Sequence, residues 1–219
     1  MEINKERIKL EIALAKYLLT NKVKKLQLGC GPNPIEGFFN TDIQTIEGVY
    51  YVDECRPLPF KDKTFHFIFL EHNFEHLSYR DGRALLRECY RILKPNGVLR
   101  LTTPCLEFLL EIYNHPETEL NQAYMKWHFE KNSPEIFDDF KDNLPPALLI
   151  SNFMRLWGHK CLYDHSSIER CLSLAGFNKI QFCEVGESNH QDLRNLEHHQ
   201  YVIPAQYNAM ETMCLEATK

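Results

Sequence analysis

The chain has 219 residues, of which 44% are hydrophobic and 25% charged, so it is long enough to bury a core and too ordinary for a disordered, coiled-coil or collagen-like protein. Its 25 Lys and Arg against 30 Asp and Glu give a net charge of −5, without a polybasic run, which argues against a nucleic-acid partner. The N-terminus is charged where a signal peptide is apolar, and no stretch is long and apolar enough to span a membrane. We therefore expect a cytoplasmic protein with no membrane partner.

The first half of the chain reads as a helix followed by short strands. Apolar residues at helical spacing predict an amphipathic helix over residues 3–20. The period then changes, and short apolar runs predict strands over 24–28, 38–43 and 49–52. The run FHFIFL at 65–70 is apolar almost throughout, as expected of a parallel strand covered on both faces.

A crossover unit and an insertion follow. Helical spacing predicts a helix over 81–93, and Lys-Pro-Asn-Gly at 94–97 ends it before a strand over 98–103. Strand, helix and strand in this order form a parallel crossover unit. Residues 105–165 do not continue the alternation of strands and helices. They contain four prolines and many aromatic residues, which indicates an inserted helical or loop lid. The remaining predicted elements are a helix over 167–175 and strands over 179–185 and 213–217.

Polar residues follow the strands of this expected sheet. Ligands of open parallel sheets bind beyond the carboxyl ends of the strands. The first end carries two glycines at 29–31, which let a ligand approach the backbone, and the second carries Asp42, suited to two ribose hydroxyls. Asp53 follows the third, and Glu-His-Asn-Phe-Glu-His at 71–76 follows the fourth. Each acidic residue alone is more often a loop cap, but their order together indicates a nucleoside site.

Four segments lie in register with a known family: LQLGCGPNP at 26–34, NTDI at 40–43, DECRPLPFKDKTFHFIFLEHNFEHL at 53–77 and LLRECYRILKPNGVLRLTTP at 85–104. They resemble the class I S-adenosylmethionine-dependent methyltransferases, near the small-molecule group described as type 11. The resemblance implies an α/β fold with a doubly wound, mostly parallel, seven-stranded Rossmann-like sheet. We expect one domain with an N-terminal helix over 3–20, a cofactor-binding half over 24–104, a substrate-recognition insertion over 105–165 and C-terminal elements over 166–219.

The resemblance also implies the cofactor, S-adenosylmethionine, and its contacts. Residues 29–31 would line its methionine and ribose portion, Asp42 would bind the ribose hydroxyls and Asp53 would accept from the adenine amino group. The turn at 70–72 would lie beside the methionine amine and the sulfonium. The cofactor-binding residues implied are Gln27, Gly29, Cys30, Gly31, Asp42, Ile43, Asp53, Glu54, Leu70, Glu71 and His72.

The sequence departs from the family pattern in two ways. Gln27 stands where the family commonly has an acidic residue near the cofactor amine, so we expect altered affinity rather than loss of binding. Only residues 32–37 separate the first two strands, too few for a crossover helix, so we expect an abbreviated connection there with the helix over 3–20 on that flank. Pro34 replaces the third glycine of a dinucleotide fingerprint, which argues against a nicotinamide oxidoreductase.

The predicted catalytic residues are His72 and His76. His72 ends the fourth strand, where the methyl group should point, and we expect it to act as the base for a hydroxyl acceptor. The alternative is that His72 shapes the pocket and His76 bonds a backbone carbonyl. Their spacing also suits a metal, but His-Asn-Phe-Glu-His is not the His-Glu-x-x-His zinc signature and no Cys-x-x-Cys pair occurs, so no metal is expected.

The substrate is expected in the insertion, where aromatic residues can wall a pocket and where His128, His159 and Tyr163 are the predicted substrate-binding residues. His198 and His199 are expected to be surface loop residues with no role. The predicted function is methyl transfer to an oxygen or nitrogen of a small polar metabolite. The alternative is a noncatalytic binder of S-adenosylmethionine or S-adenosylhomocysteine that acts as a partner or regulatory subunit. An open cavity that meets the sulfonium site would favour the enzyme over the noncatalytic binder. The sequence does not indicate an oligomeric state.

Overall fold

One twisted sheet organises the protein in a computed structural model that describes residues 2–44 and 46–219, with 2–4 and 200 described in the backbone only. Its seven strands have the order β3-β2-β1-β4-β5-β7-β6, and β7 is antiparallel to both of its neighbours while β1 to β5 pair in parallel. This arrangement confirms the predicted doubly wound α/β sheet. The strands are β1 (Lys25–Leu28), β2 (Phe39–Asp42), β3 (Tyr50–Tyr51), β4 (Phe65–Glu71), β5 (Leu93–Pro104), β6 (Lys179–Cys183) and β7 (Thr212–Thr218).

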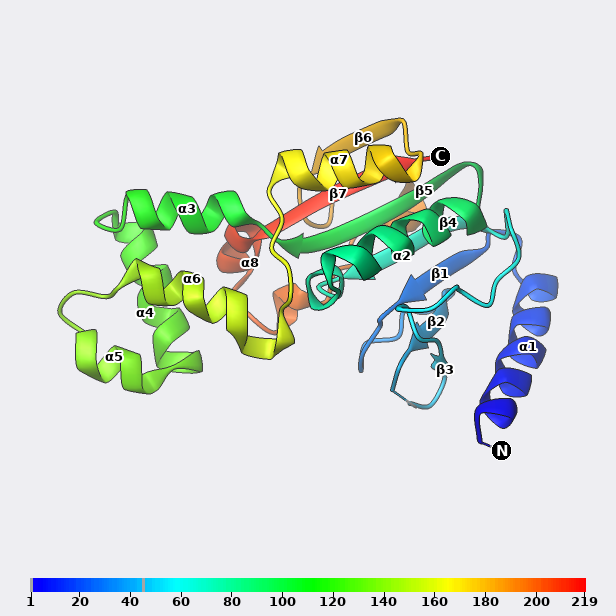
Figure 1. The fold of residues 1–219 in the computed structure, drawn as a ribbon, viewed down its shortest axis with the longest axis horizontal. Helices are drawn as coiled ribbons and strands as arrows, with labels where there is room; N and C mark the ends of the chain where they lie inside the picture. Colours follow the sequence, from blue (N-terminus) through cyan, green and yellow to red (C-terminus); the bar gives the residue numbers. More distant parts are fainter. Residues whose placement is uncertain (1, 45) are drawn as a thin grey trace.

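Helices α2 (Tyr79–Ile92) and α7 (His165–Ala175) lie side by side over one face of the sheet (Figure 1). Ser78 caps α2 by accepting from the backbone of Asp81, and Asp164 and Ser167 form a capping box at the start of α7. The buried side of α2 carries apolar residues at helical spacing, which is why it packs on the strands. These residues are Leu85, Leu86, Cys89 and Ile92.

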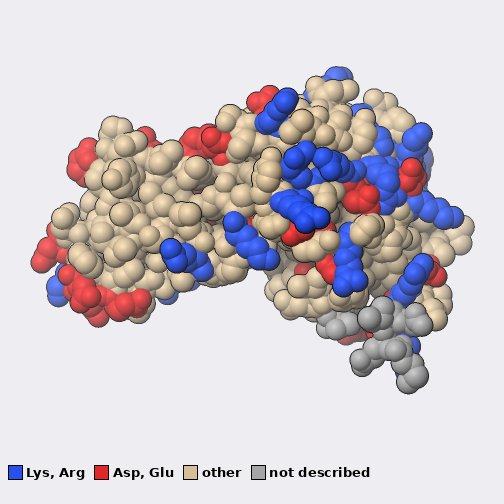
Figure 2. All heavy atoms as spheres, viewed as in Figure 1, with Lys and Arg blue, Asp and Glu red and all other residues tan. Residues whose placement is uncertain are grey.

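The insertion forms a separate group of helices beyond the carboxyl end of the sheet (Figure 1). Its elements are α3 (Leu106–Asn114), α4 (Glu119–Asn132), α5 (Pro134–Phe140), α6 (Pro146–Arg155) and the 3₁₀ turn η2 (Leu156–Gly158). Figure 2 shows the result as two lobes, with the insertion on one side and the sheet and its helices on the other. The short helix α8 (Ala205–Glu211) leads from this region into β7.

The opposite face of the sheet is covered by an irregular segment, residues 184–204, which contains the 3₁₀ turns η3 (Gln191–Leu193) and η4 (His199–Tyr201). We call this segment the strap. Beneath it, fully buried Arg100 on β5 contacts Glu197 of the strap at 2.6 Å and Glu216 on β7 at 2.9 Å. The strap is therefore held to the sheet by a buried ion-pair cluster.

The first two strands are joined without a helix, as the short spacing predicts. Gln27 of β1 accepts from the backbone N–H of Ile35 at 3.0 Å and donates to the carbonyl of Asn33 at 3.2 Å, so its amide ties down the connection. Helix α1 (Glu2–Thr20) packs on that flank through Tyr17, whose ring lies 5.5 Å from that of Phe39. The helix therefore covers the side of the sheet that the missing crossover helix leaves open.

Some element bounds differ from the prediction. Strand β3 contains only two of the four residues expected at 49–52. Strand β5 begins at Leu93 rather than 98 because Leu93 pairs with Phe65 of β4. The residues between also bond to the C-terminus: Asn96 donates to the carbonyl of Lys219, and Lys219 donates back to Gly97. None of the helices described is both long and apolar enough to span a bilayer.

Candidate active site

Two adjoining cavities open beyond the carboxyl ends of the central strands. The first, of about 470 Å³, is lined by the turn after β1 and by the ends of β2 and β4, and we call it the glycine-lined cavity. The second, of about 360 Å³, lies between the sheet and the insertion, and we call it the aromatic cavity. Both volumes are those of small-molecule sites. His72 and His76 line both cavities, which therefore meet at these two side chains.

The two glycines after β1 serve different purposes. Gly29 has a φ of +60°, and a Cβ there would lie 1.2 Å from the side-chain nitrogen of Asn73, so glycine is required for Asn73 to pack against the turn. Gly31 has a φ of +52°, and a Cβ there would meet no described atom within 4 Å. Its backbone is therefore open to a ligand in the glycine-lined cavity.

Asp42 ends β2 in the wall of the glycine-lined cavity. One carboxylate oxygen accepts from the backbone N–H of Gly31 and the other from that of Gln44, each at 2.8 Å. A carboxylate has about four lone-pair directions, so two remain for ligand hydroxyl groups. The buried side chain is thereby held in one orientation.

Asp53 and Glu54 follow β3 and line the same cavity. Asp53 accepts from the backbone N–H of Cys55 at 3.0 Å and from the side chain of Arg56 at 2.8 Å. Glu54 is buried, and both of its oxygens accept from the amide nitrogen of Asn73, at 3.2 and 3.0 Å. Burial raises the pKa of Glu54 to about 8, although the Asn73 hydrogen bonds oppose the shift.

These groups fit an adenosyl cofactor: a backbone turn open at Gly31, a held carboxylate at Asp42 and a second carboxylate at Asp53. Of the predicted cofactor-binding residues, seven line the glycine-lined cavity, namely Gly29, Gly31, Asp42, Ile43, Asp53, Glu54 and His72. Gln27, Cys30 and Glu71 line an adjoining hollow of about 190 Å³. Leu70 is fully buried and lines neither space.

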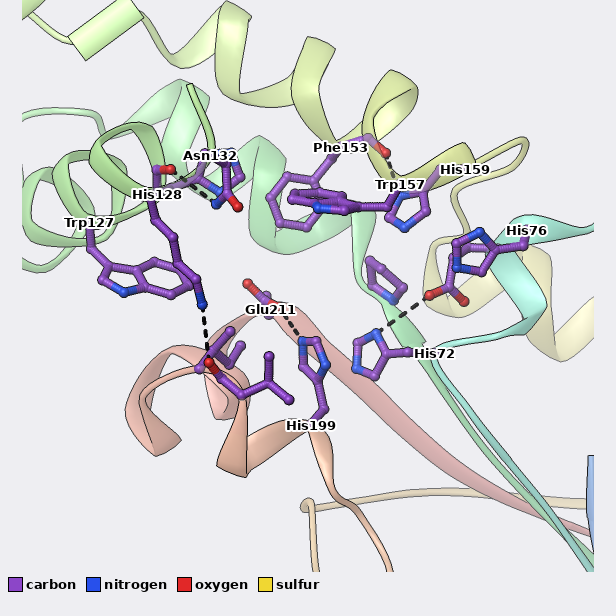
Figure 3. A pocket seen from close by; sticks show the side chains of 15 residues that line it. His72, His76, Trp127, His128, Asn132, Phe153, Trp157, His159, His199 and Glu211 are labelled. Atoms are coloured by element: carbon purple, nitrogen blue, oxygen red, sulfur yellow. Dashed lines mark hydrogen bonds and ion pairs between the residues drawn. The ribbon is translucent and has the colours of Figure 1, made fainter. Parts of the chain in front are cut away.

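The aromatic cavity is built from both lobes, as Figure 3 shows. Trp127 and His128 come from α4, Phe153 comes from α6, and Trp157 and His159 follow it. The facing wall belongs to the sheet half, through His72, Glu75, His76, His199 and Glu211. A largely aromatic wall on one side thus faces histidines and carboxylates on the other.

His72 is hydrogen-bonded at one ring nitrogen and faces a carboxylate with the other. It ends β4 with a φ of 43°, in the left-handed region. The hydroxyl of Thr212 donates to Asn208 at 2.9 Å, so its oxygen accepts from Nε2–H of His72 at 3.1 Å. Nδ1 of His72 then faces Oε1 of Glu75 at 3.5 Å. Nδ1 is therefore the position where the ring can gain or lose a proton.

His72 and Glu75 alter each other's proton affinity. Burial lowers the pKa of His72, but Glu75 with Glu211 and Glu71 outweighs it, so the pKa is raised. Burial raises the pKa of Glu75, but His72 outweighs it, so that pKa is lowered. Oε2 of Glu75 accepts from Thr103 at 3.1 Å, whereas buried Oε1 accepts no hydrogen bond from the described residues.

His199 was expected at the surface, and this was wrong. Its ring stacks on that of His72 with centroids 4.0 Å apart, and its Nε2 lies 3.2 Å from a carboxylate oxygen of Glu211. The other oxygen of Glu211 accepts from the hydroxyl of Tyr124. Nothing in the spacing of the sequence signals this group, because the strap crosses the sheet only in the folded chain.

The three predicted substrate-binding residues do not lie together. His128 and His159 line the aromatic cavity, and burial lowers the pKa of His128 to about 4, which keeps the ring neutral. Nδ1–H of His159 donates to the carbonyl of Phe153 at 2.6 Å. Tyr163 lies outside the cavity lining, buried against Phe74 with ring centroids 5.1 Å apart.

Comparison with known families gives one match. Residues 38–101 match a family described as a methyltransferase domain, and this segment runs from β2 into β5 and so includes Asp42, Asp53 and His72. No curated protein matches the chain.

An S-adenosylmethionine-dependent methyltransferase of Mesorhizobium loti is a similar solved structure, with 12% identity, 96% of this chain and 98% of that chain covered, and a TM-score of 0.52. Another, from Thermotoga maritima, is described as a possible histamine N-methyltransferase and has 16% identity, 100% and 95% coverage, and a TM-score of 0.49. A third, from Archaeoglobus fulgidus, has 18% identity, 98% and 94% coverage, and a TM-score of 0.47.

Proposed function

We propose that this chain, a class I S-adenosylmethionine-dependent methyltransferase by its family match and its strand order, methylates an oxygen or nitrogen of a small polar molecule held in the aromatic cavity. The observation that carries the proposal is the pair of adjoining cavities. Because His72 and His76 line both of them, an acceptor in the aromatic cavity would lie beside the glycine-lined cavity. A noncatalytic binder would have no use for this second, adjoining space.

The glycine-lined cavity is where we propose that the cofactor binds. Asp42 would accept from the ribose hydroxyls, Asp53 would accept from the adenine amino group and the backbone at Gly31 would lie against the ligand. S-adenosylmethionine supplies a methyl group on a sulfonium, and the acceptor's lone pair forms the new bond to carbon as the carbon–sulfur pair returns to sulfur, giving S-adenosylhomocysteine. The protein must hold the acceptor in line and keep water out.

We assign proton removal, where the acceptor requires it, to His72, and we place His76 beside the acceptor as a second predicted residue of the site, not as the base. The acceptor's proton would move to a ring nitrogen as the new bond forms, so that charge balances. At His72 the receiving atom is Nδ1, since Nε2 already donates to Thr212, and Glu75 stabilises a proton there. A positioned base of this kind contributes roughly 100- to 10,000-fold in rate.

The aromatic cavity favours a small, flat or partly apolar acceptor with a polar group. Its volume of about 360 Å³ is at the low end for ligand pockets. The rings of Trp127, Phe153 and Trp157 offer apolar surface on the insertion side. The acceptor's polar end would face the histidines and carboxylates of the sheet half.

The proposal is tested by offering the protein and labelled S-adenosylmethionine to fractionated metabolite pools. Label should appear in a small molecule, and His72→Gln should lower turnover while leaving the affinity for S-adenosylhomocysteine within about threefold. A matched control is His115→Gln, at an exposed position outside both cavities. Label found in no small molecule, with the cofactor bound normally, would contradict the proposal.

A further inference from the structure

We propose that Glu75, His76 and His159 form a binding site for one divalent transition-metal ion of the zinc type, with an open coordination position toward the aromatic cavity. One carboxylate oxygen and one nitrogen from each ring all lie within 4.8 Å of one another. With metal–ligand distances of about 2.0–2.2 Å, two ligands of one tetrahedral ion lie roughly 3.3–3.6 Å apart, so rotations of the side chains that close the gaps by about 1 Å bring the three into range.

The second observation is that Glu75 is buried and that one of its carboxylate oxygens has no hydrogen-bond donor in the part of the chain that the structure describes. Its side chain is about 1% exposed, and Oε1 accepts no hydrogen bond from the described residues. The nearest group able to carry a positive charge is Nδ1 of His72, at 3.5 Å, beyond ordinary hydrogen-bond length. A buried carboxylate oxygen without a donor is costly, and coordination of a cation removes that cost.

The ligands are also oriented as metal ligands usually are. Nδ1–H of His159 donates to the carbonyl of Phe153 at 2.6 Å, which leaves Nε2 with its lone pair free. The other oxygen of Glu75 accepts from Thr103 at 3.1 Å. Outer contacts of this kind fix the ring tautomer and the carboxylate before the ion arrives.

The backbone keeps the two ligand-bearing segments together. The N–H groups of Lys160 and Cys161 both donate to the carbonyl of Glu75, at 2.8 and 3.1 Å. Just before His159 the chain turns through Trp157 and Gly158, with φ of 57° and 84°. A non-glycine residue held in this region is strained, and such strain is common where a side chain must be aimed.

Two imidazoles and one carboxylate with open positions suit zinc, iron(II) or cobalt(II) better than magnesium or calcium, which prefer oxygen ligands. Because all three residues line the aromatic cavity, the open position faces the space proposed for the acceptor. The role of the ion rests on the proposed function: it would hold the acceptor's oxygen or nitrogen and lower its proton affinity. Binding of the ion itself does not depend on that function.

The test is a titration of chelator-treated, full-length protein with Co²⁺, followed by visible absorption and by equilibrium dialysis. We expect one equivalent bound at micromolar Co²⁺, with d–d bands and no thiolate charge-transfer band. His159→Ala should weaken binding at least tenfold, and so should Glu75→Gln. His159→Ala is the decisive variant because its half-buried side chain can be removed with less risk to the fold, which retained binding of S-adenosylhomocysteine would verify.

The control is the other possible metal cluster among the described residues, Cys105, Glu107 and His165. His165→Ala should leave the Co²⁺ titration unchanged, because that cluster lies outside both cavities. No binding by the wild type, a thiolate band, or unchanged binding by folded His159→Ala would each overturn the proposal. Methyl transfer that persists without metal would overturn the ion's role while leaving the proposed function intact. Metal binding without any methyl transfer would leave the metal site intact and overturn the proposed function together with the ion's role in it.

Discussion

Glu54 is a carboxyl group whose burial makes stability depend on pH. Because burial raises its pKa to about 8, the folded chain binds a proton that the unfolded chain releases between about pH 4.5 and 8. Unfolding therefore releases a proton in this window, and rising pH favours unfolding. We expect Glu54→Gln to gain stability relative to the wild type as pH rises from 5 to 8, by up to about 4 kcal/mol. Urea unfolding at pH 5, 6.5 and 8 measures this, with exposed Glu36→Gln as the control.

We expect Asp42 to contribute most to cofactor affinity. Removal of its carboxylate deletes the acceptor for the N–H of Gly31 and the proposed acceptor for two ribose hydroxyls. Hydrogen bonds to charged groups contribute about 1.5–3 kcal/mol each, so Asp42→Ala should raise the Kd for S-adenosylhomocysteine at least tenfold in calorimetry. Asp139→Ala, on exposed α5, should leave it unchanged. Equal affinities in the two variants would contradict this assignment of the ribose site.

Residues at the ends of predicted strands could be located from sequence, because a strand's end is a local feature. Asp42 and Asp53 are of this kind, and both line one cavity. His199 and Glu211 could not be located, because they reach His72 only through the path of the strap. The close packing of Gly29 against Asn73 was missed for the same reason: a glycine pattern does not say what approaches the glycine.

Among the elements, the strap depends on the buried cluster around Arg100. Burial alone would lower the pKa of Arg100, but neighbouring Cys214 and Glu197 outweigh it, and the pKa is raised. Arg100→Met removes the cation that faces Glu197 and Glu216, and breaking such buried pairs costs about 3–5 kcal/mol. Urea unfolding should register that loss. Adding Glu197→Gln and Glu216→Gln to the variant should recover part of it, and no recovery would argue that lost packing, not charge, destabilises the chain.

Elements with a clear period were predictable and irregular ones were not. Helix α2 and strand β4 follow from apolar spacing, since each buries one continuous surface. The strap has no such period, because its backbone groups bond to turns and to side chains of other segments, as the N–H of His199 does to Glu71. The insertion is helical, but the placement of its helices depends on contacts with distant segments. The carbonyl of Glu75, which accepts from two N–H groups beyond α6, is an example.

At the scale of the whole molecule, we predict that the insertion determines affinity for the acceptor and the sheet half determines affinity for the cofactor, so that single mutations change one without the other. Trp127 lines only the aromatic cavity and rests on Tyr207, with ring centroids 4.9 Å apart, whereas Asp53 lines only the glycine-lined cavity. Trp127→Ala should raise the KM for the acceptor about tenfold or more, because it removes a large apolar contact, and should leave the Kd for S-adenosylhomocysteine unchanged. Asp53→Ala should raise the Kd for S-adenosylhomocysteine and leave the KM for the acceptor unchanged. Steady-state kinetics and calorimetry on both variants measure the four values. If Trp127→Ala weakened the cofactor as much as Asp53→Ala does, the two cavities would act as a single site and the division between the lobes would be wrong.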